Sequence, residues 1–388
     1  MSTYESGTLE SWKHWSLRVC CLGLLLVVAA RASAGTTDPR TVVVSPVPGD
    51  AAASGTELRD QLAGISSPSS TNRWLLKVEP GTYDIGSTAL PMRSWVDIEG
   101  SGIGVTTIRG TVNASASPSH GTVDGASDAE LRLLTVEAIA TSTVPHVAGI
   151  YNSAAFPRLY RVKVVAQGTT GSIVWGIRNL TSAPRIEECE ISATSTGTGS
   201  VATGITYKNF VSGGQRSSIL RSKIAVSGAA TNYGIHSLSA MTLTEVRDSR
   251  IDVTDGGSTY GIHAEIDGGW SGNESLTVRN TEVSSAGGSS ASYGVFLGES
   301  TSVYLDVAVS KIWGHVSSTA YGIYQIGPDG AVVVRGSDIV GSTGTVVTEA
   351  NASIASTELN GGAAYAGGWL GCMGVWDESA VFYTNTCP

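Results

Sequence analysis

Six side chains able to stack on or hydrogen-bond to a ligand recur at one place in a repeated pattern. Each follows a Gly-Ile or Gly-Val pair, as in Tyr293-Gly294-Val295-Phe296. The set is Tyr151, Arg178, His236, His263, Phe296 and Tyr324. If the Ile or Val is buried in a strand, alternation points the next residue outward, and equal spacing places the six in one column. Sugar rings can stack on such a column, so glycan is the ligand that we expect.

The same alignment has a structural explanation, which the pattern favours. Like residues in register stabilise a repeating sheet by stacking on one another. A companion set precedes each glycine, namely Trp175, Tyr233, Tyr260, Tyr293 and Tyr321. Because one glycine separates it from the Ile, this set either shares a side with the buried Ile or sits at a corner. We expect it to pack in the core.

Metal and acid chemistry have weaker support in the sequence. His236 and His263 are one repeat apart, and no third ligand is evident, so we expect no metal site there. The densest acidic region consists of Glu245, Asp248, Asp252, Asp255 and Asp267. Calcium is an alternative for it, but scattered acids in turns are usually solvated, and we expect no cofactor. Register should place Asp248 one coil from Asn280 and from Arg221.

Two sequence patterns with the same period position all these side chains. The first is the Gly-Ile or Gly-Val pair described above. The second is a six-residue frame with an apolar first residue, a small or hydroxyl-bearing fourth and a β-branched residue or Leu sixth. Its ends, spaced 20 to 33 residues apart, are Ile108, Val136, Val164, Ile191, Ile224, Ile251, Val283, Ile312, Ile339 and Leu359. One unit cannot bury its own apolar residues, whereas units stacked about 4.8 Å apart bury a continuous column. The sequence predicts an all-β fold, a right-handed parallel β-helix of about ten coils.

The third and fourth positions of the frame are expected to form a corner. The fourth is small, as in Val162, Cys189, Ser222, Ser249, Thr281, Ser310, Ser337 and Thr357. The third often carries a residue that tolerates a left-handed backbone, such as Asp248, Asn280 or Gly336. Arg161, Glu188 and Arg221 fit this corner less well. Cys189 is expected to be a buried small residue.

The two ends of such a stack must be covered, because they expose unpaired strand edges. Glu57–Ile65 predicts a short amphipathic helix, with Ser54 and Glu57 as its capping box. Near the other end, a Cys372–Cys387 disulfide is expected to stabilise the chain by roughly 3 kcal/mol. The predicted divisions are 1–34 (signal peptide), 35–70 (N-terminal segment and capping helix), 71–360 (β-helix) and 361–388 (C-terminal cap with the disulfide).

The first 34 residues resemble a secretory signal. A basic leader with Lys13 and Arg18 precedes Val19–Ala30, an apolar run of twelve, and Ala32-Ser33-Ala34 precedes the expected cleavage. The run is short for a membrane span, so we expect cleavage, with retention as an anchor as the alternative. The expected location is secreted, periplasmic or cell-surface, and no further membrane span is expected.

Composition agrees with strands and with an acidic surface. The chain has 48 Gly and only 15% charged residues, which favours strands and turns over helices. Its net charge is −9, and removal of residues 1–34, with three basic and two acidic side chains, makes it −10. Such a surface repels phosphate backbones, so we expect no nucleic-acid partner. The oligomeric state stays open.

At the level of the scaffold, the chain resembles the pectin lyase-like superfamily of right-handed parallel β-helices. The resemblance lies in Pro48-Gly49-Asp50, the helix after it and the stretch 74–83, which are similar to the entry into the β-helix in pectinesterases and polygalacturonases. It covers about Thr41 to Leu359. Its members include polysaccharide lyases, hydrolases, esterases and epimerases, but also proteins without chemistry. The enzyme signatures are absent; the nearest match to Gly-His-Gly, Ser119-His120-Gly121, lacks the surrounding acids.

We therefore expect a non-catalytic exported protein that serves in binding or as a scaffold, with polysaccharide as its partner. The alternative is a polysaccharide-acting lyase, hydrolase or esterase with a non-standard active site. Its active groups would lie in the insertions at the long gaps, near residues 192–218 and 252–275.

Overall fold

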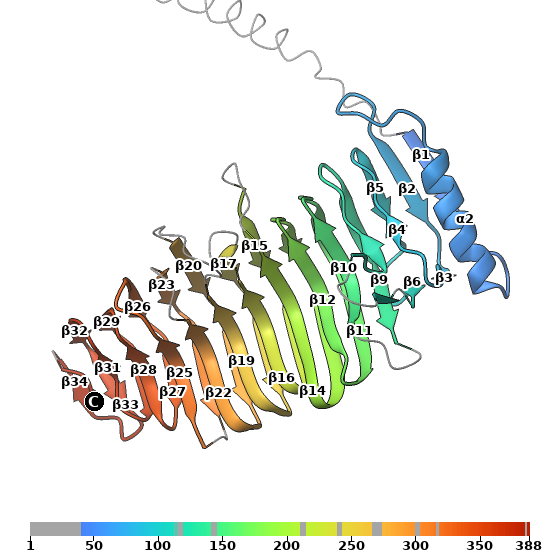
Figure 1. Ribbon diagram of the computed structural model, residues 1–388. Helices are drawn as coiled ribbons and strands as arrows, with labels where there is room; N and C mark the ends of the chain where they lie inside the picture. Colours follow the sequence, from blue (N-terminus) through green and yellow to red (C-terminus); the bar gives the residue numbers. More distant parts are fainter. Residues whose placement is uncertain are drawn as a thin grey trace, which may run out of the picture. The chain divides into compact units, whose positions relative to one another are not determined.

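The computed structural model describes residues 40–388 except 112, 115–118, 141–145, 210–214, 239–242, 266–273, 299–302, 316–317 and 385. In these ranges, short strands pair in parallel with the strand one coil before and one coil after (Figure 1). This confirms the predicted parallel β-helix. The expected signal peptide, 1–34, lies outside the described residues. No described helix is long and apolar enough to cross a membrane.

The strands form three rows, named here in the order in which the chain visits them. Row 1 contains β1 (Arg40–Val44), β2 (Trp74–Val78), β5 (Val96–Glu99), the first parts of β9 (Glu130–Ile139) and β11 (Arg158–Thr170), β13 (Arg185–Glu187), β15 (Ser217–Leu220), β17 (Leu243–Arg247), β20 (Glu274–Arg279), β23 (Val303–Ala308), β26 (Gly330–Arg335), β29 (Asn351–Ala355) and β32 (Leu370–Met373).

Row 2 contains β3 (Gly81–Asp84), β6 (Thr106–Gly110), the second parts of β9 and β11, the first parts of β14 (Glu190–Lys208) and β16 (Lys223–Ser237), β18 (Arg250–Thr254), β21 (Glu282–Ala286), β24 (Lys311–His315), β27 (Asp338–Gly341), β30 (Glu358–Gly361) and β33 (Val375–Asp377). Row 3 contains β4 (Leu90–Pro91), β8 (Val123–Asp124), β10 (His146–Ser153), β12 (Ile173–Leu180), the second parts of β14 and β16, β19 (Gly256–Ala264), β22 (Gly288–Leu297), β25 (Ala320–Gln325), β28 (Gly344–Thr348) and β31 (Tyr365–Ala366).

Two short strands pair antiparallel instead. β7 (Asn113–Ala114) pairs with β10, and β34 (Phe382–Tyr383) pairs with β33. Parallel pairing already begins at Arg40 and continues to β33, so it extends beyond both ends of the expected range 71–360. The predicted Cys372–Cys387 disulfide is present and ties β32 to the C-terminus.

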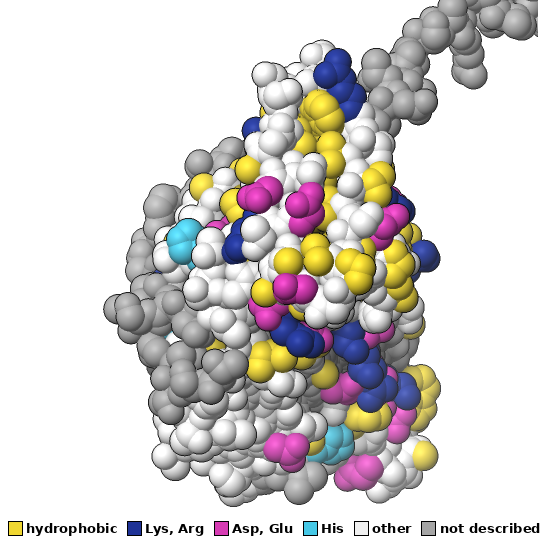
Figure 2. Space-filling view, turned by 90° about the vertical axis from the view of Figure 1, so that its right-hand side faces the viewer, with side chains coloured by type: hydrophobic (Ala, Val, Ile, Leu, Met, Phe, Trp, Pro, Cys, Tyr) yellow, Lys and Arg dark blue, Asp and Glu magenta, His cyan; other side chains and the backbone are white. Residues whose placement is uncertain are grey.

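The interior is the predicted column of β-branched residues and Leu in row 2. All ten frame-ending residues, from Ile108 to Leu359, are at most 2% exposed. Direct register pairs join them, as in Ile224 with Ile251 and Ile251 with Val283. Stacking therefore buries against the neighbouring coil the apolar side chains that a single coil would expose. On the outside, acidic, basic and apolar side chains lie interspersed on the face that Figure 2 shows.

The corner between rows 1 and 2 is left-handed in every coil from Arg161 onward. Its third-position residues have φ between 45° and 55°: Arg161, Glu188, Arg221, Asp248, Asn280, Val309, Gly336 and Ser356. Arg161, Glu188 and Arg221, which residue preference favours less at this corner, adopt the same conformation. Each Ser or Thr at position four from Ser222 to Ser337 accepts a backbone N–H from the previous coil, as Ser249 Oγ does from Ser222 (3.1 Å), and this ladder holds the corner.

The small fourth position is buried, as predicted. Cys189 is 2% exposed, and its burial raises the pKa of the thiol to about 12. Its Sγ donates to the carbonyl oxygen of Glu187, where Ser222 Oγ donates to the equivalent carbonyl of Leu220. Cys189 is therefore a structural substitute for serine in the ladder.

The N-terminal helix is longer than predicted. α2 spans Ala51–Gly64, and Asp50 is its N-cap, accepting the Ala53 N–H at 2.9 Å. The predicted capping box at Ser54 and Glu57 is wrong, because Ser54 is buried inside the first turns and donates to the Asp50 carbonyl at 2.7 Å. The alanines before Ser54 are strong helix formers, which explains the earlier start. Leu58 and Leu62 are buried, as expected of the apolar face.

Candidate functional site

Two columns of rings run side by side along the outer side of row 3. One column pairs Tyr233, Tyr260, Tyr293 and Tyr321 in register, and the other pairs His236, His263, Phe296 and Tyr324. We call these eight side chains the aromatic face. The expectation that the tyrosine set packs in the core is wrong, because its members are half-buried on the surface.

The reason lies in the Gly-Ile pair between the columns. Ile235 is fully buried, and a Cβ on Gly234 would point at the core residue Ile251, so both members of the pair face inward. Two successive inward residues break the alternation of the strand. The residues on either side, Tyr233 and His236, therefore both face outward, and their rings stack with centroids 4.2 Å apart.

The rings of the aromatic face mainly cover one another. Tyr233 and Tyr260 stack at 4.9 Å, Tyr260 and Tyr293 at 5.1 Å, and Tyr293 and Tyr321 at 5.6 Å, with interplanar angles of 10° to 17°. Ring faces are thus turned toward neighbouring coils, and solvent meets ring edges and hydroxyl groups. This is the stacking that the structural explanation of the pattern predicts.

The six residues predicted for ligand binding share one register column but not one open surface. Thr206 stands between Arg178 and His236 and separates Tyr151 and Arg178 from the rings. Tyr151 and Arg178 are only 7% and 9% exposed. The Arg178 guanidinium lies over the Trp175 ring at 4.6 Å, and burial lowers its pKa. His236, Phe296 and Tyr324 remain half-exposed, and His263 is nearly buried.

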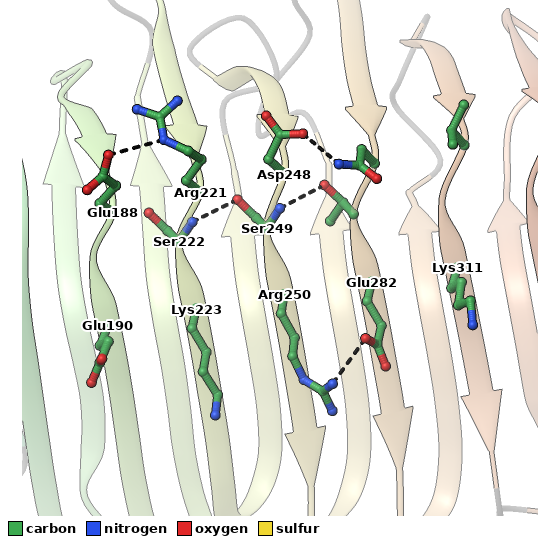
Figure 3. Close-up of a pocket in the computed structure, with 13 residues that line it drawn as sticks. Glu188, Glu190, Arg221, Ser222, Lys223, Asp248, Ser249, Arg250, Glu282 and Lys311 are labelled. Atoms are coloured by element: carbon green, nitrogen blue, oxygen red, sulfur yellow. Dashed lines mark hydrogen bonds and ion pairs between the residues drawn. The ribbon is translucent and has the colours of Figure 1, made fainter.

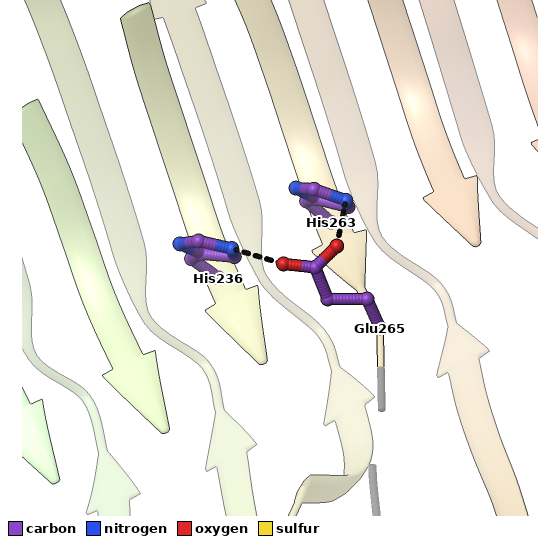
Figure 4. Close-up of side chains that lie close together, drawn as sticks. All are labelled: His236, His263 and Glu265. Atoms are coloured by element: carbon purple, nitrogen blue, oxygen red, sulfur yellow. Dashed lines mark ion pairs between the residues drawn. The ribbon is translucent and has the colours of Figure 1, made fainter. Parts of the chain in front are cut away.

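A carboxylate joins the two histidines of the aromatic face (Figure 4). Their imidazoles stack at 4.9 Å and 8°, and the two Nε2 atoms lie 3.5 Å and 3.6 Å from separate oxygens of Glu265. Burial, then the neighbouring His236, lower the pKa of His263 to about 3. His236, whose Nε2 lies 3.5 Å away, lowers the pKa of Glu265. A neutral His263 imidazole thus faces an ionised carboxylate.

Sequence reasoning missed Glu265. It follows the last residue of β19, where the chain leaves row 3 and enters one of the predicted insertions. The available signal was His263-x-Glu265 at a strand end, with His236 one coil earlier. Within the described ranges, the three are the one group of at least three His, Cys, Asp or Glu side chains whose ligand atoms lie within 4.8 Å of one another.

A second candidate is a charged trough on the outer side of the corner (Figure 3). It has a volume of about 580 Å³ and contains Asp248, Asn280 and Arg221 in adjacent coils, as register predicted. Asn280 donates to Asp248 at 2.7 Å. Arg250 reaches Asp252 at 2.6 Å and Glu282 at 3.0 Å. The contacts of Asp248 with Asn280 and of Arg250 with Glu282 join adjacent coils.

The acidic region considered for calcium does not converge. Glu245 and Asp248 lie 3.8 Å and 3.5 Å from the Arg247 guanidinium, and Asp252 pairs with Arg250. Asp267 lies outside the described residues. Neighbouring guanidinium groups oppose the approach of a cation to these carboxylates.

No protein-family model and no curated protein matches the chain. Similar solved structures include the A-module of mannuronan C-5 epimerase AlgE6 from Azotobacter vinelandii, with 15% identity over 80% of this chain and 96% of that one and a TM-score of 0.38. Pectin methylesterase PemA from Erwinia chrysanthemi has 11% identity over 89% and 85%, with a TM-score of 0.35. Polygalacturonase from Erwinia carotovora has 10% identity over 85% and 96%, with a TM-score of 0.37. The predicted superfamily resemblance is one of scaffold, and likeness at this level says nothing of activity.

Proposed function

We propose that this protein binds an extended polysaccharide along the aromatic face, outside the cytoplasm. The observation behind the proposal is the repetition of ring edges and hydroxyl groups once per coil along a half-buried strip of the surface. Among the described residues, the hydroxyl groups of Tyr293 and Tyr324 have no hydrogen-bond partner. Free hydroxyl groups beside apolar ring edges suit sugars, which offer hydroxyl groups and C–H surfaces together.

The tyrosine column ends at Tyr321, whose register partner in the next coil is Gly344. The Tyr321 ring lies against this glycine, where a Cβ would stand 3.1 Å from two ring carbons. A sugar chain along the face would therefore contact the ring edges and hydroxyl groups of Tyr293 and Tyr324. The Cys372–Cys387 disulfide supports a location outside the cytoplasm, where disulfides persist.

Affinity electrophoresis with uronate-containing and neutral polysaccharides tests the proposal. We expect at least one glycan to retard the protein, and retardation to weaken in Tyr324→Ala and Phe296→Ala. Tyr293→Phe and Tyr324→Phe keep the stack and remove only hydroxyl groups, so they separate ligand binding from folding. Tyr304→Phe, on an exposed row 1 tyrosine outside the face, is the matched control. Absence of retardation on every glycan, or equal retardation of all variants, contradicts the proposal.

One observation favours the alternative of a polysaccharide-acting enzyme. His236, His263 and Glu265 place two imidazoles beside a carboxylate, a set able to transfer protons, and Glu265 lies in the predicted insertion 252–275. Turnover of any polysaccharide by the wild type, lost in both His236→Phe and His263→Phe, would establish this alternative over binding alone.

A further inference from the structure

We propose that His236, His263 and Glu265 form a binding site for a divalent transition-metal ion, with Zn²⁺ as the ion that the ligand set fits best. The proposal goes beyond glycan binding and does not depend on it. Two imidazole nitrogens and one carboxylate oxygen are ligands that Zn²⁺ accepts, and three protein ligands leave a fourth position for water or a bound molecule.

The distances are close to those that the ion needs. Tetrahedral zinc with bonds of about 2.0–2.1 Å places its ligand atoms about 3.3 Å apart. The Glu265 oxygens already lie 3.5 Å from His236 Nε2 and 3.6 Å from His263 Nε2. In Figure 4 both Nε2 atoms point toward the carboxylate. The ligand atoms of the three residues lie within 4.8 Å of one another, so the two rings must turn toward each other to bring both Nε2 atoms to the separation that zinc needs.

Three of the four ring nitrogens have no hydrogen-bond partner among the described residues. His236 Nε2 and both ring nitrogens of His263 are buried without a hydrogen bond, and His263 is 7% exposed. Buried polar atoms in native proteins are almost always paired. A metal ion on the Nε2 lone pairs would satisfy two of the three atoms.

The charge environment favours a cation. The two buried acidic residues of the described ranges are held by arginines: Glu187 by Arg158, Arg185 and Arg221, and Asp306 by Arg279 and Arg335. Among the described residues, Glu265 forms ion pairs with the two histidines alone. The Glu265 carboxylate, with no arginine or lysine paired to it among the described residues, supplies negative charge for a divalent ion.

The ligands are also held in place before any ion binds. The His236 ring stacks on Tyr233 at 4.2 Å, and the His263 ring stacks on Tyr260 at 5.0 Å and meets the edge of Phe296 at 4.7 Å. Restriction of the rings lowers the entropy cost of binding. Glu265 is 40% exposed, which gives the ion a path from solvent. Since His263 Nδ1 lacks an acceptor that would orient the ring, we expect micromolar rather than tighter affinity.

Calorimetric titration of the untagged, full-length mature chain with ZnCl₂ at neutral pH tests the site. We expect one ion per chain with a micromolar Kd and a rise in Tm on addition of Zn²⁺. Co²⁺ should give the visible absorption of a tetrahedral site and be displaced by Zn²⁺. Ca²⁺ and Mg²⁺, which prefer oxygen ligands, should not compete.

The variants distinguish this site from adventitious binding. His236→Phe and His263→Phe keep an aromatic ring in the column, as Phe296 does in the coil after His263. Glu265→Gln keeps the shape of the side chain. Each should weaken Zn²⁺ binding by about ten-fold or more. His315→Phe, in row 2 and outside the cluster, should leave it unchanged. No saturable binding by the wild type, or equal binding by the three cluster variants and the control, overturns the proposal. Glycan retardation is measured on the same variants. If the metal proposal fails, this second measurement still tests the polysaccharide proposal on its own.

Discussion

Gly234 lies directly against Ile251 of the next coil. A Cβ on Gly234 would stand 2.4 Å from Ile251 Cγ2 and 2.5 Å from the Gly261 carbonyl oxygen. The same relation joins Gly176 to Ile191 and Gly204 to Ile224. The two sequence patterns therefore share one period because they meet in the core: the glycine of row 3 receives the Ile of row 2.

Gly234→Ala should accordingly destabilise the protein by about 1–3 kcal/mol, because the added methyl group cannot avoid the backbone of Gly261. Gly64→Ala is the matched control, since a Cβ there meets nothing within 4 Å. Urea unfolding followed by circular dichroism measures both. Equal midpoints for the two variants would show that the coil can widen at no cost.

The contact between Gly234 and Ile251 also explains which features of the fold could be predicted from the sequence. The Ile and Val column and the corner were predictable, because burial repeats in every coil. The outward tyrosines were not, since the alternation rule assigns Tyr233 and Ile235 to one side unless the strand bends, and the bend at Gly234 comes from packing against Ile251. Glu265 escaped prediction because it lies in an insertion, where the period is lost.

Val309 is the least suitable residue at the left-handed corner. Its φ is 51°, a conformation that is costly for a β-branched residue, and its side chain is 67% exposed. Val309→Asn should therefore stabilise the protein by about 1 kcal/mol. Val105→Asn, at an exposed valine outside the left-handed set, should show no such gain. Chemical unfolding of the two variants checks the prediction, and a loss of stability in Val309→Asn would contradict it.

The reverse change tests the same corner. Asn280 has φ 45° and donates to Asp248 at 2.7 Å. Asn280→Val should lower stability by about 1–2 kcal/mol, since the left-handed backbone becomes strained and a hydrogen bond is lost. Thermal unfolding of the double variant Asn280→Val with Asp248→Ala is compared with that of Asp248→Ala alone. Neither protein has the hydrogen bond, so the difference in stability between them measures the backbone strain.

Loss of the disulfide should act locally. Cys372 and Cys387 are 15 residues apart, so the bond closes a short loop and stabilises the folded chain by about 3 kcal/mol. In a repeat fold each coil contacts only its neighbours. The double variant Cys372→Ala with Cys387→Ala should therefore exchange amide hydrogens faster in β32 and β33, with β16 and β18 unchanged. Uniform acceleration along the stack would mean that the coils unfold as one unit.

Stability should fall on mild acidification because of His263. Burial lowers its pKa from 6.5 to about 3 in the folded chain. Between these values the unfolded chain binds a proton that the folded chain does not, so the free energy of unfolding decreases as pH falls below 6.5, by at most about 1.4 kcal/mol per pH unit. Above 6.5 this contribution to the slope vanishes, because both states are neutral there.

Urea midpoints of the wild type and His263→Phe, measured between about pH 5 and 7 without metal, isolate this term. That window lies above the range in which Glu265, whose pKa is lowered, takes up its own proton. We expect the wild-type midpoint to fall toward pH 5 and the His263→Phe midpoint to fall less, with His315→Phe following the wild type. Parallel curves for all three would mean that the imidazole is protonated in the folded chain as readily as in the unfolded one.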